Sequence, residues 1–348
     1  MPYERIGVAI VGLGFVGGQA HVPSFMNIPG SELVAVIDVD EDKARRFANK
    51  YDVNYYQDYK EAIRDSKIGA IVVASPTPFH HKLVSDAIAR GKHVLCEMPL
   101  TQSIEDSEKL GEEADEAGVI LMPDLNFRFT PNYLKAKELL DAGIIGSTLA
   151  VNYTEFIAAK ELAAQWPLSS WAWDMERSGG YPDFTLSVWS IDLVRWLLGA
   201  EIEDAQWTTN YSTLSDIENF IGYNTVGIIK FSSGAVGVLH YCSTVSLGEG
   251  TSRLEIFGDN TKTLRANWNN DLVLTEGGRR QEWMFREKGA RVWGHYQLDS
   301  YFVECILGGK KPTITVKDAV EAQKVASKIA GNRPLPDINV RPNSIAPH

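Results

Sequence analysis

The sequence of 348 residues contains few cysteines and lacks the features of secreted and membrane-inserted proteins. Its three cysteines, Cys96, Cys242 and Cys305, lie far apart and form neither a Cys-x-x-Cys pair nor a zinc-binding pattern. No apolar run of about twenty residues occurs, and the N-terminus lacks the order of segments that a signal peptide needs. We therefore expect a reducing, cytoplasmic location, with no metal site and no membrane contact.

Positive charge is also scarce relative to negative charge. The formal net charge is −11, and the sequence contains no run of basic residues. Nucleic acids and anionic membranes are bound by clustered Lys and Arg, so neither is an expected partner. Because 44% of the residues are hydrophobic, a chain of this length can bury a large core, and two domains are expected.

Short apolar runs alternate with amphipathic segments in the first third of the chain. The apolar runs are rich in Val and Ile, as strands buried on both faces are, and they cover residues 6–11, 33–37, 70–74, 93–96 and 119–122. The amphipathic segments have helical spacing and cover residues 40–50, 80–90 and 104–117. This alternation predicts an α/β fold, namely a Rossmann-type, doubly wound parallel sheet.

The turn after the first predicted strand reads GLGFVG and has the spacing Gly-x-Gly-x-x-Gly. Gly12 would allow the tight turn, and Gly14 would let a pyrophosphate approach the helix N-terminus. Asp38 ends the second predicted strand, where a carboxylate accepts hydrogen bonds from an adenosine ribose. The alternative is a glycine-rich turn that binds nothing. The cofactor residues expected here are Gly12, Leu13, Gly14, Phe15, Val16 and Asp38.

Acidic residues around Asp38 favour NAD over NADP. Asp40, Glu41 and Asp42 would repel a 2′-phosphate, whereas the first arginine comes about one helical turn later, at Arg45.

Two further loops follow predicted strands at the edge where an open α/β sheet binds its ligand. The first, SPTPFHH, contributes Ser75, Pro76, Thr77 and His80, and the second, CEMP, contributes Glu97 and Met98. We expect His80 to face either the crevice, as a cofactor contact, or solvent.

The pattern changes near residue 124. A loop, a helix and several segments of alternating polar and apolar residues follow, as in an antiparallel sheet with one covered face. The predicted strands cover residues 148–157, 203–212, 223–231, 235–245, 252–257, 262–267, 271–275 and 281–286. We assign residues 1–124 to a dinucleotide-binding domain, 125–331 to an α+β domain with a large, open, mostly antiparallel sheet, and 332–348 to an extended tail.

The ordered segments GLGFVG, TPFHHKL, GKHVLCEMP, NFRFTP and SGGYPDFTLSVWSIDLVRWLLG, together with Asp38, resemble the glucose-fructose oxidoreductase and inositol dehydrogenase family, called Gfo/Idh/MocA. The resemblance spans nearly the whole chain. It implies NAD as cofactor and a sugar, sugar derivative or cyclitol as small-molecule substrate, oxidised or reduced at a hydroxyl or carbonyl. It also implies a homodimer or homotetramer formed through the sheet of the second domain.

Two signatures of that family are altered in this chain. Met98 stands where the family has a lysine beside the reacting hydroxyl, and a thioether neither donates a proton nor carries charge. An ungapped count from Asp192 places Trp189 at the family's histidine and Thr185 at its first aspartate. A shifted register would align Asp183 with that aspartate instead. In either register the histidine is missing.

Another group must therefore accept the hydroxyl proton. The candidates are Tyr181, Asp183 and Lys160, although each is also compatible with a solvated or helix-capping role. Asp192 is a further candidate, and its alternative roles are to pair with Arg195 or to orient a neighbour. His295 is a distant alternative, for which a structural role is favoured.

The expected substrate contacts are Met98, Arg128, Trp173, Thr185 and Trp189. Flat aromatic faces stack on sugar rings, and an arginine binds a carboxylate or phosphate through two hydrogen bonds. Arg128 is also placed near the cofactor by the resemblance, and an inter-domain salt bridge is its alternative role.

Three functional classes fit these residues. The first is an NAD-dependent oxidoreductase with a substituted proton relay. The second is an enzyme that retains NAD and catalyses elimination, epimerisation or glycoside cleavage without net redox change. The third is a sensor that has kept the dinucleotide site and lost its chemistry.

Overall fold

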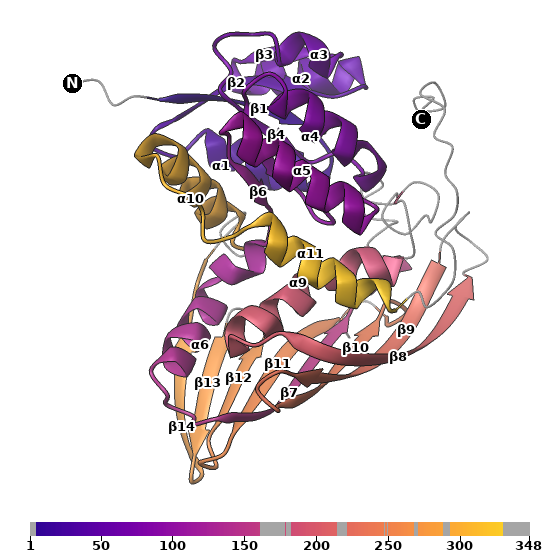
Figure 1. The fold of residues 1–348 in the computed structure, drawn as a ribbon, viewed down its shortest axis with the longest axis vertical. Coiled ribbons are helices and arrows are strands. Elements are labelled where there is room, and N and C mark those ends of the chain that lie inside the picture. Colours follow the sequence, from indigo (N-terminus) through magenta and orange to yellow (C-terminus); the bar gives the residue numbers. More distant parts are fainter. Residues whose placement is uncertain are drawn as a thin grey trace.

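The structure is a computed structural model that describes residues 5–160, 178, 182–213, 221–246, 248, 250–267, 271–287 and 293–329. The side chains at positions 182, 183, 212, 213 and 221 lie outside this description. Two sheets organise the chain, one above the other in Figure 1, with helices between them.

The first sheet has six parallel strands in the order β3-β2-β1-β4-β5-β6. Its strands are β1 (Ile6–Val11), β2 (Ser31–Ile37), β3 (Asn54–Tyr56), β4 (Ala70–Val73), β5 (His93–Cys96) and β6 (Leu121–Pro123). The strand order reverses between β1 and β4, and ligands of such sheets bind at the carboxyl ends of the strands beside that reversal. The predicted Rossmann-type domain is therefore confirmed.

Helices connect these strands as the sequence predicts. They are η1 (Gly17–His21), α1 (Val22–Phe25), α2 (Glu41–Tyr51), α3 (Tyr59–Ala62), η2 (Thr77–Phe79), α4 (His80–Ile88) and α5 (Ile104–Ala117). Local capping sets their ends: Asp40 accepts a hydrogen bond from the Lys43 amide at the start of α2, and Gly118 takes the left-handed conformation after α5.

The second sheet has eight strands in the order β14-β13-β12-β11-β7-β10-β9-β8, and all neighbours are antiparallel except β7 and β10. The strands are β7 (Thr148–Phe156), β8 (Ile202–Thr213), β9 (Ile221–Phe231), β10 (Val236–Cys242), β11 (Thr251–Gly258), β12 (Thr263–Asn267), β13 (Asp271–Glu276) and β14 (Arg279–Met284). This confirms the predicted large, mostly antiparallel sheet.

Five further helical segments join the two halves of the molecule. They are η3 (Asn126–Phe129), α6 (Pro131–Asp141), α9 (Pro182–Leu198), α10 (His295–Gly308) and α11 (Val316–Ser327). Figure 1 shows α9 and α11 between the two sheets. Helices α10 and α11 follow the second sheet in sequence. Even so, α10 packs on β1 and α1, and α11 packs on α5 and on α9.

A buried cluster of ion pairs holds three of these segments together. Arg128 in η3 donates two hydrogen bonds to Asp192 in α9, and its Nη2 atom also lies 2.9 Å from an oxygen of Asp318 in α11. The Arg128 and Asp192 side chains are 8% and 1% exposed. Because its guanidinium is occupied by two carboxylates of its own domain, Arg128 joins η3 to α9 and α11 within residues 125–331, and the structure supports neither an inter-domain salt bridge nor cofactor or substrate binding by it.

Candidate functional site

The glycine-rich loop after β1 has the geometry that a dinucleotide requires. Gly12 has φ = +94°, which disfavours residues with a side chain. A Cβ atom on Gly17 would lie 1.9 Å from the Gly12 carbonyl oxygen, whereas one on Gly14 would meet nothing within 4 Å. Gly12 and Gly17 therefore close the turn, and Gly14 leaves one side of the backbone open to a ligand.

Asp38 ties this loop to the end of β2. Its Oδ2 atom accepts a hydrogen bond of 2.8 Å from the Leu13 amide, and its Oδ1 atom accepts one of 3.0 Å from the Asp40 amide. The Lys43 ammonium lies 3.1 Å from both oxygens. The carboxylate is thus held beside the glycine-rich loop, and its contact with Lys43 was not expected from the sequence.

The loop after β4 contributes a buried hydroxyl to the same edge of the sheet. Among the described residues, Ser75 Oγ has no hydrogen-bond partner, although it is buried. A buried polar atom without a partner costs free energy, so it is commonly satisfied by a ligand or water. Thr77, which begins η2, is buried as well.

His80 does not face the crevice or solvent, and that expectation was wrong. Its side chain is buried, with Nδ1 located 2.9 Å from the Pro99 carbonyl oxygen and Nε2 located 2.7 Å from the Ser75 carbonyl oxygen. Burial lowers the pKa of His80, although both carbonyl contacts act to raise it. Because both ring nitrogens contact the backbone, His80 positions the loops after β4 and β5.

The loop after β5 places Met98 in a buried position, with 4% of its surface exposed. Its amide donates a hydrogen bond of 3.3 Å to Glu97 Oε2. We expected Glu97 to contact the cofactor. Its other carboxylate oxygen, Oε1, lies beside the rings of His21 and His295. The position of the family's lysine therefore has no charge of its own and lies beside a buried ionisable cluster.

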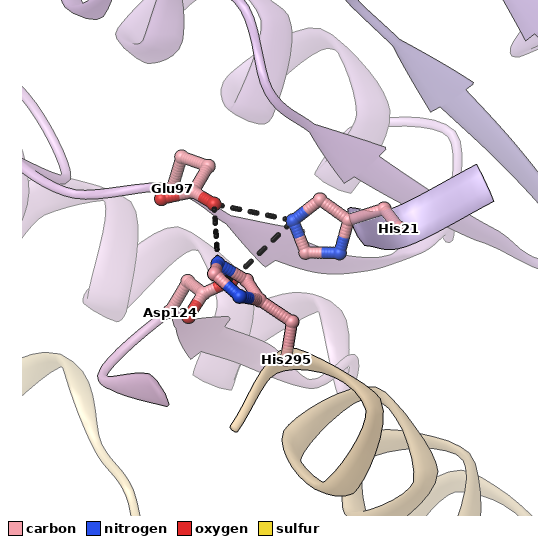
Figure 2. A group of neighbouring side chains, drawn as sticks. All are labelled: His21, Glu97, Asp124 and His295. Carbon is pink, nitrogen blue, oxygen red and sulfur yellow. Dashed lines mark hydrogen bonds and ion pairs between the residues drawn. The ribbon is translucent and has the colours of Figure 1, made fainter. Parts of the chain in front are cut away.

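That cluster contains His21, Glu97, Asp124 and His295, as Figure 2 shows. They come from η1, from the ends of β5 and β6, and from the start of α10. His21 Nε2 lies 3.2 Å from Glu97 Oε1 and 3.4 Å from Asp124 Oδ2, and His295 Nε2 lies 3.6 Å and 4.0 Å from the same oxygens.

The pKa values of this cluster are strongly displaced. Burial acts to lower the pKa of His21, but Asp299, Glu97 and Asp124 together raise it well above its ordinary value. Burial acts to raise the pKa of Glu97, but hydrogen bonds from His21 and His295 lower it well below the usual range. Burial and the neighbouring charge of Glu97 raise the pKa of Asp124.

Only part of this cluster was expected from the sequence, namely Glu97 as a cofactor contact and His295 as a distant alternative. His21 and Asp124 were not expected. The position of Asp124 directly after β6, beside Glu97 after β5, is the signal that was present, because adjacent parallel strands end at one edge. We expected no metal site, yet these four groups present donor atoms within 4.8 Å of one another.

Helix α9 supplies the second altered signature. The Trp189 indole donates a hydrogen bond of 2.9 Å to the Asp124 carbonyl oxygen, and Thr185 is buried one turn earlier. Trp189 therefore lies next to the strand ends of the first sheet. Asp192 lies 3.6 Å from Arg195, as one of its alternative roles predicts, but its stronger partner is Arg128.

Only some of the expected proton acceptors lie among the described residues. Tyr181 and Trp173 lie outside the described residues, and of Asp183 only the backbone, in the first turn of α9, is described. Lys160 is half-buried and lies four residues after the end of β7. The expected site residues that the structure locates near the carboxyl ends of the first sheet are 12–16, 38, 75–77 and 97–98, and those on α9 are 185 and 189.

Comparison with known proteins agrees with this geometry. Residues 6–125 match the family model described as an oxidoreductase family with an NAD-binding Rossmann fold, and residues 133–263 match the GFO/IDH/MocA C-terminal domain. The chain is 30% identical to myo-inositol 2-dehydrogenase of Thermotoga maritima over 331 residues, which cover 90% of this chain and 91% of that protein. It is 28% identical to scyllo-inositol 2-dehydrogenase (NAD(+)) of Bacillus subtilis, over 91% of this chain and 90% of that protein.

A solved structure agrees as well. The chain superimposes with a TM-score of 0.79 on GenD2 from gentamicin A biosynthesis in complex with NAD, at 25% identity and with 95% of each chain covered. Within the described residues, no helix is long and apolar enough to cross a membrane. The glycine-rich loop, the two sheets and the two family matches together show that this chain belongs to the Gfo/Idh/MocA family of NAD-dependent oxidoreductases.

Proposed function

We propose that the protein interconverts a secondary hydroxyl and a carbonyl on a cyclitol or related sugar, with NAD as the hydride carrier. The observation that carries this proposal is the coincidence of an open glycine-rich loop, the Asp38 carboxylate and the buried Ser75 hydroxyl at one edge of the first sheet. Similarity to two inositol dehydrogenases over about nine tenths of the chain supports the substrate class.

In this proposal, the glycine-rich loop would hold the pyrophosphate of NAD through the amides of residues 14–16, while the Leu13 amide is bound by Asp38. Asp38 accepts hydrogen bonds from the adenosine ribose, and the Ser75–Thr77 segment lines the path to the nicotinamide. NAD supplies the acceptor for the hydride that leaves the carbinol carbon. The segment before α10 would exclude water from this edge of the sheet, because Trp293, two residues before the helix, contacts the Phe15 ring at a centroid distance of 5.4 Å.

The substrate then lies between the loop after β5 and helix α9. Met98, Thr185 and Trp189 are the contacts we propose from the described residues, and Trp173 is the contact we propose from outside them. The flat indole of Trp189 is fixed by its hydrogen bond to Asp124, so it offers a rigid face against a ring.

Loss of the hydride from an alcohol requires loss of the hydroxyl proton, and neither Met98 nor Trp189 accepts one. Tyr181, Asp183 and Lys160 are the proposed acceptors.

The first experiment is incubation of the protein with NAD and a panel of cyclitols, sugars and glycosides. Reduced nicotinamide and product mass are followed together. Accumulation of NADH with a ketone product supports the proposal. A changed product without net NADH would contradict it and would favour an enzyme that retains NAD through a transient oxidation. Absence of both, with NAD bound, would favour the sensor.

A substitution tests the altered signature directly. Met98→Lys restores an ammonium beside the reacting hydroxyl, and we expect the rate of alcohol oxidation to rise by about tenfold or more, because a positioned acid or base contributes about 10²- to 10⁴-fold. Met98→Leu is the matched control, since it keeps an apolar side chain of similar size. An equal rate in the two variants would show that the pocket does not use this position for proton transfer.

We also propose a homodimer or homotetramer formed through the outer face of the second sheet. Large apolar side chains are exposed on three adjacent strands: Leu149 on β7, Val226 and Ile228 on β9, and Val236 and Val238 on β10. Ile228 lies directly opposite Val238 in the strand pairing. A contiguous apolar surface of this kind is typical of a subunit interface.

A cytoplasmic location is proposed on the cysteines alone. Cys96, Cys242 and Cys305 are all buried free thiols, which suits a reducing compartment.

A further inference from the structure

The four side chains in Figure 2 have the composition of a metal centre. Two imidazoles and two carboxylates direct one donor atom each toward a common point, and all four donor atoms lie within 4.8 Å of one another. Imidazole and carboxylate donors in a set of four suit Zn²⁺ and related divalent transition metals.

The distances between donor atoms match a tetrahedron. With metal–ligand bonds of about 2.0–2.1 Å, neighbouring donors in a tetrahedral zinc site are separated by about 3.3–3.4 Å. Three of the four measured nitrogen–oxygen separations are 3.2, 3.4 and 3.6 Å. The fourth, between His295 Nε2 and Asp124 Oδ2, is 4.0 Å and needs the largest adjustment.

Asp124 gives independent evidence for a bound cation. Its side chain is fully buried, and neither carboxylate oxygen has a hydrogen-bond partner among the described residues. Within the described part of the chain, Asp124 forms ion pairs with His21 and His295 alone. A buried carboxylate in this condition is costly unless a cation satisfies it.

Asp299 provides the outer contact that metal-bound histidines normally have. His21 Nδ1 lies 2.9 Å and 3.2 Å from the two oxygens of Asp299, which is fully buried. A carboxylate at Nδ1 fixes the imidazole tautomer with its proton on that nitrogen and leaves the Nε2 lone pair directed at the cluster. The cation would therefore find a preoriented ligand.

We propose that His21, Glu97, Asp124 and His295 bind one divalent transition-metal ion, for which Zn²⁺ is the best match. The site links the Rossmann-type domain to α10, because His295 begins that helix and the other three ligands belong to residues 21–124. The metal ion would also place positive charge next to Met98, because its ligand Glu97 is the preceding residue. A catalytic role for that charge rests on the proposed function, whereas metal binding itself does not.

Metal binding is tested on the full chain after removal of bound metal with a chelator. Zn²⁺ titration by calorimetry should give one tight site per chain, and Co²⁺ should give the intense visible absorption of a tetrahedral complex. Mg²⁺ should not compete. Metal content of the protein as purified is measured in parallel.

Variants identify the ligands. Asp124→Asn and His295→Gln should each weaken Zn²⁺ binding by more than about 100-fold, and Asp299→Asn should weaken it by about 10- to 100-fold through His21. His81→Gln is the matched control, because its side chain is 39% exposed and lies in another part of the domain. It should bind Zn²⁺ as the unchanged protein does.

Two results would overturn the proposal. One is the absence of a stoichiometric Zn²⁺ site and of a tetrahedral Co²⁺ spectrum in the unchanged protein, which would leave protonated histidines as the partners of the carboxylates. The other is Zn²⁺ binding that Asp124→Asn and His295→Gln leave intact. If either variant fails to fold, the measurements on the unchanged protein still decide. Because no readout depends on turnover, failure here is distinct from failure of the proposed dehydrogenase activity.

Discussion

Replacement of Asp38 by Ser should move the cofactor preference from NAD toward NADP. In the structure, the Asp38 carboxylate lies beside the glycine-rich loop and within 3.1 Å of the Lys43 ammonium. Without the carboxylate, NAD loses its ribose acceptor. Lys43 is then left without that partner, in a position where it can bind a 2′-phosphate, and serine keeps a small hydrogen-bonding group near the Leu13 amide.

The size of the shift follows from these contacts. A hydrogen bond to a charged group contributes about 1.5–3 kcal/mol, so NAD should lose about 2 kcal/mol when the carboxylate is removed. Relief of like-charge repulsion and a new contact from Lys43 should favour NADP by at least about 1 kcal/mol at this largely buried position. A combined change of about 3 kcal/mol corresponds to about a 100-fold change in the ratio of kcat/KM values.

The assay compares kcat/KM for NAD and NADP with the best substrate of the panel. Glu41→Ser is the matched control, since it removes one negative charge at an exposed position in the first turn of α2, the helix that contains Lys43. The double variant Asp38→Ser/Lys43→Ala should keep the loss for NAD and lose the gain for NADP. A change below about 3-fold in Asp38→Ser, or an equal change in Glu41→Ser, would refute the assignment of Asp38 to the ribose.

Three further outcomes are expected. Arg128→Met removes the cation that faces the buried Asp192 carboxylate, so the free energy of unfolding in urea should fall by about 3–5 kcal/mol, whereas Arg45→Met, at an exposed ion pair, should leave it almost unchanged; equal effects would contradict the role of the buried cluster. Burial raises the pKa of Glu155 to about 7, so the folded protein holds this proton more tightly than the unfolded chain does, and stability from this group is complete below about pH 4.5 and lost as the pH rises through about 7. Glu155→Gln should remove about 3 kcal/mol of that pH dependence, measured as the difference in unfolding free energy between about pH 5 and pH 8, and identical slopes in the two proteins would show that Glu155 titrates normally. Ile228→Lys should convert the oligomer to monomers in analytical ultracentrifugation, because a charge on the exposed apolar face opposes its burial, and an unchanged mass would place the interface elsewhere.

The elements of the first domain could be predicted because their signals are local. Gly12 is required by a backbone conformation at one residue, and the apolar runs that form β1, β2, β4 and β5 are buried within a few residues of where the sequence places them. The alternating strands of the second sheet follow from a period of two, which does not depend on distant parts of the chain. The elements of the first domain and the alternating strands therefore do not depend on which segments pack against them.

His80 shows where local reasoning failed. A histidine after a proline-containing loop is compatible with solvent, with a ligand or with the protein interior. Its ring is held in the interior by contacts with two backbone carbonyls, one of them 19 residues further along the chain. Arg128 is similar, since its two carboxylate partners lie 64 and 190 residues away.

The strand and helix pattern, the glycine-rich turn and the acidic end of β2 follow from local sequence, because each depends on the conformation or burial of a short segment. The folded chain is needed to see that His21, Glu97, Asp124 and His295 meet, and that Asp299, 278 residues from His21, orients one of them. These side chains come together because α10 returns to the first sheet. No periodicity or spacing along the chain encodes that convergence.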